Sequence, residues 1–527
     1  MTSSEFTDAG PRVSVNRYVI PALIGLVMAL ALVLRLIAID SRGLWTDEAV
    51  RVLAARQDTL FDTLRAAWAQ PPSAPLYWLG LHWWVALFGH GDVAVRLFSV
   101  LTSVAAIPAI YSLGRLLGGS TITRAAVGLL ASLLLAVSPL AVELGEEATM
   151  YAWTMLFATL AVWSGLSYLR DGRGKWRYML FGVLLLYTHY MGALLLAEML
   201  LAGLVWLARK TSDGTSGVTR RNWVTVHLAM ALAWTPWLIA MSIRLAQRWD
   251  ELSHLQHRAG LPELHLLASY LSVSASASVA WPAAVTWLAI SAGAGLALLA
   301  VTINRAGFDF TRLLGAIVLL FLLLLVGTSA ATGAWIVQPR YLALVLPPAL
   351  VVISAGAVAA WHWVGSHRTL LRAMAVVLLG GWFVAQASGV AAFYTNPVHG
   401  RDGVREIGAW LSAEVRAGVL VLSNHQLLPW SVAQYYDGPI QALPDSRDVR
   451  DGYLLWPTPD VLDFAPSQIA ALQPLLDRAQ PQRIWLLYLP VMDPHGLLMA
   501  KLTELYPQVT SRHYAYCDIY LFASAAK

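Results

Sequence analysis

The stretch YVIPALIGLVMALALVLRLIAIDSRGLWTDEAV (residues 18–50) decides the fold class, because it joins a long apolar run to an acidic pair. Residues 18–39 are long enough to cross ~30 Å of hydrocarbon as a helix. Asp47 and Glu48 follow just beyond the end of this run. Carboxylates beside a bilayer are costly unless a partner, a cavity or a reaction holds them. The pair is therefore a candidate functional site in a membrane protein.

The composition indicates a chain with many spans. Hydrophobic residues make up 58% of the sequence and charged residues 13%, whereas soluble globular proteins are about a quarter charged. An ordinary soluble enzyme is therefore excluded. Further apolar runs of about the length of a span lie at 93–114, 125–141, 151–169, 223–243, 281–303, 313–332, 341–364 and 370–393.

Basic residues gather at alternate junctions between these runs, which marks those junctions as cytoplasmic. Both ends of the segment 178–208 are basic, so we predict that it leaves and returns as two short helices that meet near His189. This predicts eleven spans in all, with the amino terminus inside and the carboxyl terminus outside. The aromatic run LYWLGLHWWVALFG (76–89) is short for a span, and we expect it to lie at the interface. If it crosses instead, the following spans reverse.

We predict two domains and a fold class that is mainly α. Residues 1–393 form a polytopic transmembrane helical bundle with outer loops at 40–92, 141–150 and 244–280. Residues 394–527 form a small extracytoplasmic α/β domain, because helix-like and strand-like patterns alternate there. In this tail we expect helices at 403–415 and 466–479 and strands at 418–423, 483–490 and 518–523.

Asp47 alone admits two interpretations. It can complement the amino-terminal dipole of a solvated helix, with Arg51 four residues on as an ion-pair partner. It can also belong to a site, because Glu143, Glu146 and Glu147 form a second carboxylate cluster at the outer end of another span. Two acidic loops at one interface favour a site over packing.

Two further residues fall at the same face. His189 lies at the predicted outer turn of the hairpin, where a structural role is equally compatible with the pattern. Arg340 begins a span from the outer side. An interfacial Arg can snorkel, but its guanidinium also suits bidentate binding of a lipid-linked phosphate.

Several motifs in order resemble one known group of proteins. They are LWTDEA (44–49), QPPSAPLYWL (70–79), AVRLFSVLTSVAAIPAIYSLGRLLGG (94–119), SPLAVELGEEATMYA (138–152), YTHYMG (187–192) and PRYLALVLPP (339–348). Together they resemble the GT-C glycosyltransferases related to the protein O-mannosyltransferases and the aminoarabinose transferase of lipid A. The resemblance implies transfer of a sugar from a polyprenyl-phosphate donor at the outer face, usually with inversion, with the first-loop Asp as base.

Two departures from the family pattern stand out. The usual Gln-Glu-Ala-Arg-x-Tyr reads Glu146-Glu147-Ala148-Thr149-Met150-Tyr151 here, so Thr149 replaces the Arg. The usual His-Pro-Pro-Leu-Tyr reads Gln70-Pro71-Pro72-Ser73-Ala74-Pro75-Leu76-Tyr77. Whatever the missing Arg does must be done elsewhere or not at all.

From the resemblance and the residues together, we expect an in-line displacement at the anomeric carbon. A phosphate leaving group needs little acid assistance, so a single base is enough. The expected roles are catalysis by Asp47, Glu48 and Glu147, binding of the donor phosphate by Arg340, His189 and Tyr341, and binding of acceptor or sugar by Glu146, Tyr77 and Tyr151. Asp47 and Glu147 would hold a divalent cation, Mg²⁺ or Mn²⁺, if one is used.

The expected partners are a polyprenyl-phosphate-linked sugar, a lipid, glycan or protein acceptor, and the plasma (inner) membrane of a bacterium. One cysteine, Cys517, excludes an intramolecular disulfide framework, and no basic stripe indicates nucleic acid. The alternative functions are a transporter or flippase of lipid-linked sugars, which predicts ionisable groups near the bilayer midplane, and a non-catalytic scaffold, which gives the two carboxylate clusters no reason to converge.

Overall fold

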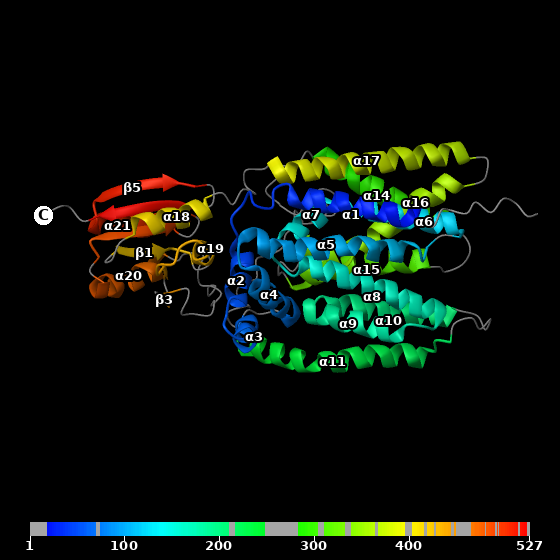
Figure 1. Ribbon diagram of the computed structural model, residues 1–527, viewed down its shortest axis with the longest axis horizontal. Coiled ribbons are helices and arrows are strands. Elements are labelled where there is room, and N and C mark those ends of the chain that lie inside the picture. Colours follow the sequence, from blue (N-terminus) through cyan, green and yellow to red (C-terminus); the bar gives the residue numbers. More distant parts are fainter. Residues whose placement is uncertain are drawn as a thin grey trace, which may run out of the picture.

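The computed structural model shows a helical bundle followed by a small sheet domain (Figure 1). The structure describes residues 18–69, 74–117, 119–209, 217–247, 283–303, 310–332, 339–363, 367–395, 403–415, 419–425, 428–443, 447–448, 465–479, 481–490, 493, 495–514 and 517–523. Most of the predicted outer loop 244–280 and the motif residues 70–73 lie outside the described residues.

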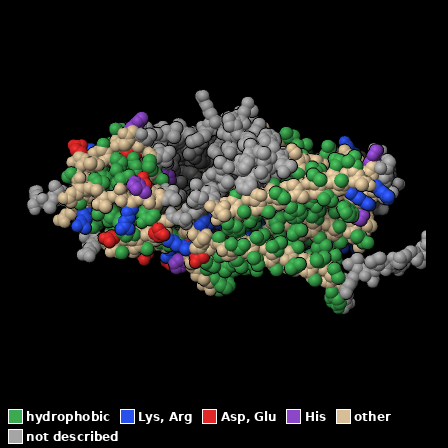
Figure 2. All heavy atoms as spheres, turned by 90° about the horizontal axis from the view of Figure 1, so that it is seen from above, with side chains coloured by type: hydrophobic (Ala, Val, Ile, Leu, Met, Phe, Trp, Pro, Cys, Tyr) green, Lys and Arg blue, Asp and Glu red, His purple; other side chains and the backbone are tan. Residues whose placement is uncertain are grey.

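The bundle is built from long apolar helices. They are α1 (Val19–Leu36), α5 (Asp92–Gly114), α6 (Thr121–Ala136), α7 (Pro139–Glu146), α8 (Tyr151–Asp171), α9 (Lys175–Thr188), α10 (Gly192–Arg209), α11 (Arg220–Gln247), α14 (Ala283–Ile303), α15 (Phe310–Thr332), α16 (Leu346–His362) and α17 (Arg368–Thr395). On the face seen in Figure 2, hydrophobic side chains cover the bundle and charged ones gather towards its ends.

By length and apolar composition, seven of the described helices can cross a membrane, or eight if the bent pair α6–α7 is one span. Several helices bury only part of their apolar surface within the chain, since the window in α1 is 11% buried and that in α11 is 17% buried. An apolar surface of this size is stable against lipid, so the protein is an integral membrane protein. The predicted number of eleven spans stays a prediction, while the hairpin α9–α10 with its turn at His189 is confirmed.

The bend between α6 and α7 measures 58° and lies where the sequence has Pro139, which has no backbone N–H to continue the helix. Arg35 of α1 fills the break. Its guanidinium donates to the carbonyl oxygens of Ala136 at 3.2 Å and Ala141 at 3.1 Å, and to Ser103 Oγ at 2.8 Å. Within the predicted outer loop 141–150, the residues up to Glu146 belong to the buried helix α7.

Three short helices, α2 (Thr46–Ala55), α3 (Leu60–Ala69) and α4 (Pro75–Phe88), form a layer between the bundle and the sheet domain (Figure 1). α4 coincides with the aromatic run 76–89 of the predicted outer loop 40–92. Leu44, Ala49 and Val52 pack against Tyr77 and Leu81 of α4. Residues 46–69 and 75–88 of the predicted outer loop thus form a packed layer of helices.

The carboxyl-terminal domain has a six-stranded sheet of order β3-β2-β1-β4-β6-β5. Strands β2, β1 and β4 are parallel, and β3, β6 and β5 complete antiparallel edges. The predicted helices and strands are present, and the structure adds α19, α21 and three strands. The elements are α18 (Val404–Glu414), β1 (Val419–Ser423), α19 (Leu428–Val432), β2 (Gln441–Ala442), β3 (Arg447–Asp448), α20 (Ala465–Ala479), β4 (Arg483–Tyr488), α21 (Leu497–Leu505), β5 (Gln508–His513) and β6 (Asp518–Ala523).

Candidate active site

Glu48 is a structural carboxylate at the start of α2. It is fully buried, and its two oxygens accept hydrogen bonds from Arg96 Nε and Nη2, both at 2.9 Å. The backbone N–H groups of Trp45, at 3.2 Å, and Ala148, at 2.9 Å, donate to the same carboxylate. A buried charge is stable only when it is paired and hydrogen-bonded in this way. The expected catalytic role of Glu48 is therefore better described as holding the loop that carries Asp47.

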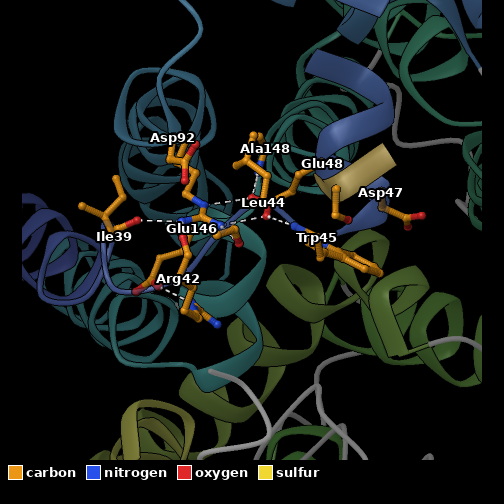
Figure 3. Close-up of polar contacts among 12 residues, drawn as sticks. Ile39, Arg42, Leu44, Trp45, Asp47, Glu48, Asp92, Glu146 and Ala148 are labelled. Carbon is orange, nitrogen blue, oxygen red and sulfur yellow. Dashed lines mark hydrogen bonds and ion pairs between the residues drawn. The ribbon is translucent and has the colours of Figure 1, made fainter. Parts of the chain in front are cut away.

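Asp47 points to a different side of α2 from Glu48 (Figure 3). Its Oδ2 accepts a hydrogen bond from Arg340 Nη1 at 2.5 Å, and the two side chains are 26% and 28% exposed. The Arg340 guanidinium also lies 5.4 Å from the ring centre of Tyr151 and 6.0 Å from that of Trp45. Two residues that the sequence places almost three hundred positions apart thus form one partly exposed ion pair.

Arg51 does not pair with the Asp47 carboxylate, contrary to the i,i+4 expectation. Its Nη1 donates to the main-chain oxygen of Asp47, and its Nη2 reaches Met150 Sδ at 3.4 Å. The residue is 8% exposed, and its Nε has no hydrogen-bond partner among the described residues. The buried hydroxyl of Thr149, at the position of the family's Arg, has no partner there either. Arg51 therefore supplies a guanidinium beside this loop.

His189 lies at the tip of the α9–α10 hairpin, beyond the ends of both helices, and is 1% exposed. Burial, together with the charges of Arg340 and Arg51, lowers the pKa of His189 to about 3, so the ring is neutral. Its Nδ1 accepts the Met191 N–H at 3.2 Å, which leaves the ring proton on Nε2. In the described part of the chain this Nε2 has no partner. It is a buried donor without an acceptor.

Three tyrosines surround this imidazole. The ring centres of Tyr190, Tyr341 and Tyr151 lie 4.6, 5.4 and 5.6 Å from that of His189. The hydroxyl groups of Tyr190 and Tyr341 are 2.7 Å apart and hydrogen-bonded to each other. The expected residues Arg340, His189, Tyr341 and Tyr151 therefore meet in one cluster next to Asp47.

The second carboxylate cluster is buried. Glu146 Oε2 pairs with Arg42 Nη2 at 2.8 Å, and Glu146 Oε1 accepts from the Tyr394 hydroxyl at 2.7 Å. This carboxylate therefore ties α7 to the first loop and to α17. The expectation that it contacts acceptor or sugar has no support in these contacts.

Glu147 follows α7 and is 7% exposed.

Burial raises the pKa of the Tyr77 phenol, and the charges of Glu48 and Glu147 add to this rise. Tyr77 itself is fully buried against Phe98, so in this conformation its ring is a packing element of α4. The convergence of Glu147 with Asp47 stays a prediction.

A divalent cation would need several oxygen or nitrogen ligands. No group of three His, Cys, Asp or Glu side chains converges among the residues that the structure describes. The Asp47 carboxylate instead pairs with a guanidinium. A cation held by Asp47 and Glu147 therefore stays a prediction, and no step of the proposed mechanism uses one.

Sequence reasoning missed four residues of this region. Arg96 and Tyr190 lie inside quoted motifs, and Arg42 lies two residues before the LWTDEA motif, so each was close to a signal. Tyr394 closes the last helix of the bundle, and no local pattern distinguishes it. The partners of Arg42, Tyr190 and Tyr394 lie more than a hundred residues away along the chain, and those of Arg96 lie about fifty residues away.

Comparisons with known proteins agree with these motifs. Residues 70–250 match the family of dolichyl-phosphate-mannose-protein mannosyltransferases. The fold is similar to that of ArnT from Cupriavidus metallidurans, with a TM-score of 0.61 at 14% identity over 96% of this chain and 99% of ArnT. A second ArnT structure, bound to undecaprenyl phosphate, gives a TM-score of 0.60 at 14% identity over 96% of this chain and 98% of ArnT.

The archaeal oligosaccharyltransferase AglB from Archaeoglobus fulgidus, in complex with an inhibitory peptide and a dolichol-phosphate, gives a TM-score of 0.55 at 9% identity. That match covers 95% of this chain and 74% of AglB. The sequence matches no curated protein. The ordered motifs, the family match over residues 70–250 and the shared fold agree, and the chain resembles the GT-C glycosyltransferases of the ArnT and protein mannosyltransferase families.

Proposed function

We propose that this protein transfers a hexose or pentose from a polyprenyl-phosphate-linked donor to an acceptor hydroxyl at the outer face of the membrane, with inversion. The observation that carries the proposal is the Asp47–Arg340 pair beside two buried donors, His189 Nε2 and Arg51 Nε, that lack partners in the described chain. A base next to unsatisfied donors suits a reaction in which a hydroxyl loses a proton and a phosphate gains charge.

The positions of the basic residues support the proposed orientation of the protein in the membrane. Basic side chains lie in or beside the turns α5–α6, α8–α9, α10–α11 and α16–α17, at the end of the bundle opposite the sheet domain. Short loops rich in Lys and Arg stay in the cytoplasm. This supports a cytoplasmic position for that end and an extracytoplasmic position for α2 and the sheet domain. A reporter that is active only outside the cytoplasm should be active when fused after Lys527.

The proposed reaction is a single displacement. The acceptor oxygen attacks the anomeric carbon, the bond from that carbon to the phosphate oxygen breaks, and the hydroxyl proton passes to the Asp47 carboxylate. The phosphodiester monoanion of the donor becomes a phosphomonoester dianion. The guanidinium groups of Arg340 and Arg51 and the Nε2–H of His189 stabilise the added charge.

Donor binding would rearrange the ion pair. The donor phosphate competes with Asp47 for Arg340. When Arg340 turns to the phosphate, the carboxylate of Asp47 loses a positive partner and its affinity for a proton rises. The base therefore becomes active when the donor is in place.

The alternative function, a transporter or flippase, needs paired ionisable groups deep in the bundle. Glu198 of α10 lies there and is 1% exposed. Its carboxyl oxygens have no polar partner among the described residues, whereas the Asp47–Arg340 ion pair lies outside the spans, beside α2. This observation favours the transferase.

The test uses detergent-purified protein with undecaprenyl phosphate-linked mannose or pentose and a membrane lipid extract as the source of acceptors. A transferase releases undecaprenyl phosphate without sealed vesicles, and Asp47→Asn lowers the rate by ~10²–10⁴-fold, the usual contribution of a general base. Asp58→Asn, an exposed carboxylate of the same loop, is the matched control. Equal rates for the two variants would remove Asp47 from the mechanism.

A further inference from the structure

The helix that carries Asp47 cannot hold its own position. α2 has ten residues, and helices shorter than about 12–15 residues are marginal in isolation. The helix packs on α4 and does not belong to the spans. Its orientation, and with it the direction of the Asp47 carboxylate, therefore depends on contacts from the layers on either side.

The bundle holds α2 from one side. Arg96 of α5 donates to the carbonyl oxygens of Ile39 and Arg42, both at 2.8 Å, and to that of Gly43 at 3.0 Å. The same guanidinium binds the Glu48 carboxylate. One buried side chain thus fixes the loop before α2 and the first turn of α2.

The sheet domain holds α2 from the other side. The Tyr435 hydroxyl accepts the Leu44 N–H at 2.7 Å and donates to Asp92 Oδ2 at 2.6 Å. Arg405 Nε donates to the same Asp92 oxygen at 2.7 Å, and its Nη2 pairs with Asp40 at 2.7 Å. These contacts fix the loop before α2 against the sheet domain.

Two more contacts reach the helix itself. Gln434 Nε2 donates to the carbonyl oxygen of Ala49 at 3.2 Å, and Trp430 packs against the buried faces of Val50 and Ala54. Close packing also sets the position of Tyr435, because a Cβ on Gly408 of α18 would lie 2.4 Å from the Tyr435 Cβ. The helix α18 therefore packs closely against this tyrosine.

We propose that the sheet domain is a positioning part of the active site, in which Tyr435, Arg405 and Gln434 orient α2 so that Asp47 meets the acceptor hydroxyl. This inference rests on the proposed function, because it assumes that Asp47 is the base. The three residues act through α2 and do not touch the substrate. Loss of one of them misplaces the base without removing a contact to the donor.

The test compares Tyr435→Phe with Tyr506→Phe in the full-length protein. Tyr506 bonds the Pro481 carbonyl oxygen at 3.1 Å inside the same domain and has no part in the contacts to α2 described above. Because small misplacements of a reacting group have large effects on rate, we expect Tyr435→Phe to lower turnover of undecaprenyl phosphate-linked mannose by about tenfold. The Kd for undecaprenyl phosphate should stay within about twofold, and Tyr506→Phe should match the wild type.

The decisive measurement is made in the Asp47→Asn background. If Tyr435 acts only through the base, adding Tyr435→Phe there lowers turnover no further, because groups that act as a unit are not additive. A further tenfold loss, or equal turnover for Tyr435→Phe and Tyr506→Phe, would overturn the inference. If Asp47→Asn itself keeps wild-type turnover, the proposed function fails instead.

Should Tyr435→Phe lose its fold in a thermal-unfolding assay, Gln434→Ala replaces it, since this change removes one hydrogen bond to α2. We expect it to lower turnover by about threefold with an unchanged Kd for undecaprenyl phosphate. Wild-type turnover in Gln434→Ala, with its thermal unfolding unchanged, would also overturn the inference.

Discussion

Replacing the proposed base should tighten the binding of the lipid phosphate. In the structure the Asp47 carboxylate forms an ion pair with the Arg340 guanidinium, and the lipid phosphate must compete for this guanidinium. Exposed ion pairs contribute about 0–1 kcal/mol, and breaking a buried pair costs about 3–5 kcal/mol. The Asp47–Arg340 side chains are 26% and 28% exposed, so we take about 1 kcal/mol for this pair, which corresponds to about fivefold in affinity.

Asp47→Asn should therefore bind undecaprenyl phosphate about fivefold more tightly than the wild type while its turnover falls. Arg340→Ala should bind it about 10- to 100-fold more weakly, because a hydrogen bond to a charged group contributes about 1.5–3 kcal/mol. Arg340→Lys should recover only part of this loss, since an ammonium cannot reproduce the guanidinium fork.

Isothermal titration of protein in lipid nanodiscs with undecaprenyl phosphate measures these affinities, with Asp58→Asn as the control of equal charge change. Weaker binding by Asp47→Asn would show that the carboxylate does not compete with the phosphate. Wild-type affinity in Arg340→Ala would refute the reasoning as a whole and leave Arg340 as an interfacial anchor.

Three further predictions concern buried titratable groups. Burial lowers the pKa of His189 from 6.5 to about 3, so below about pH 6.5 the unfolded chain binds a proton that the folded chain does not bind. The thermal stability should therefore drop towards pH 5, and it should drop less in His189→Gln. Equal pH dependence of the unfolding temperature in the two proteins would contradict a neutral buried ring. Combined Glu147→Gln and Asp47→Asn should cost less turnover than the sum of the single losses if both serve one acceptor, and strict additivity would separate them. Glu198→Met should raise the unfolding temperature by about 2–4 °C with transfer unchanged, because it removes an unpaired buried carboxyl, and lost transfer would give Glu198 a function.

Much of the fold could be predicted because its causes are local. Long apolar runs form helices in any part of a membrane protein. The hairpin with its turn at His189 and the alternating elements of the tail could therefore be predicted from the amino-acid sequence. Missed elements such as α19 and β2 are only five and two residues long, which is too short for a periodic pattern. The bend at Pro139 had a local signal, but the carbonyl groups freed there are satisfied by Arg35 from another helix.

Hydrophobicity and spacing act along the chain, so the amino-acid sequence alone is enough to predict a membrane protein with an acidic pair just outside its first apolar run. The partner of each carboxylate, in contrast, depends on how the helices pack. Asp47 and Glu48 are neighbours, yet successive residues of a helix point about 100° apart, so Glu48 meets the buried Arg96 and Asp47 meets Arg340. Such pairings depend on which distant helices pack together, and no local pattern carries that information.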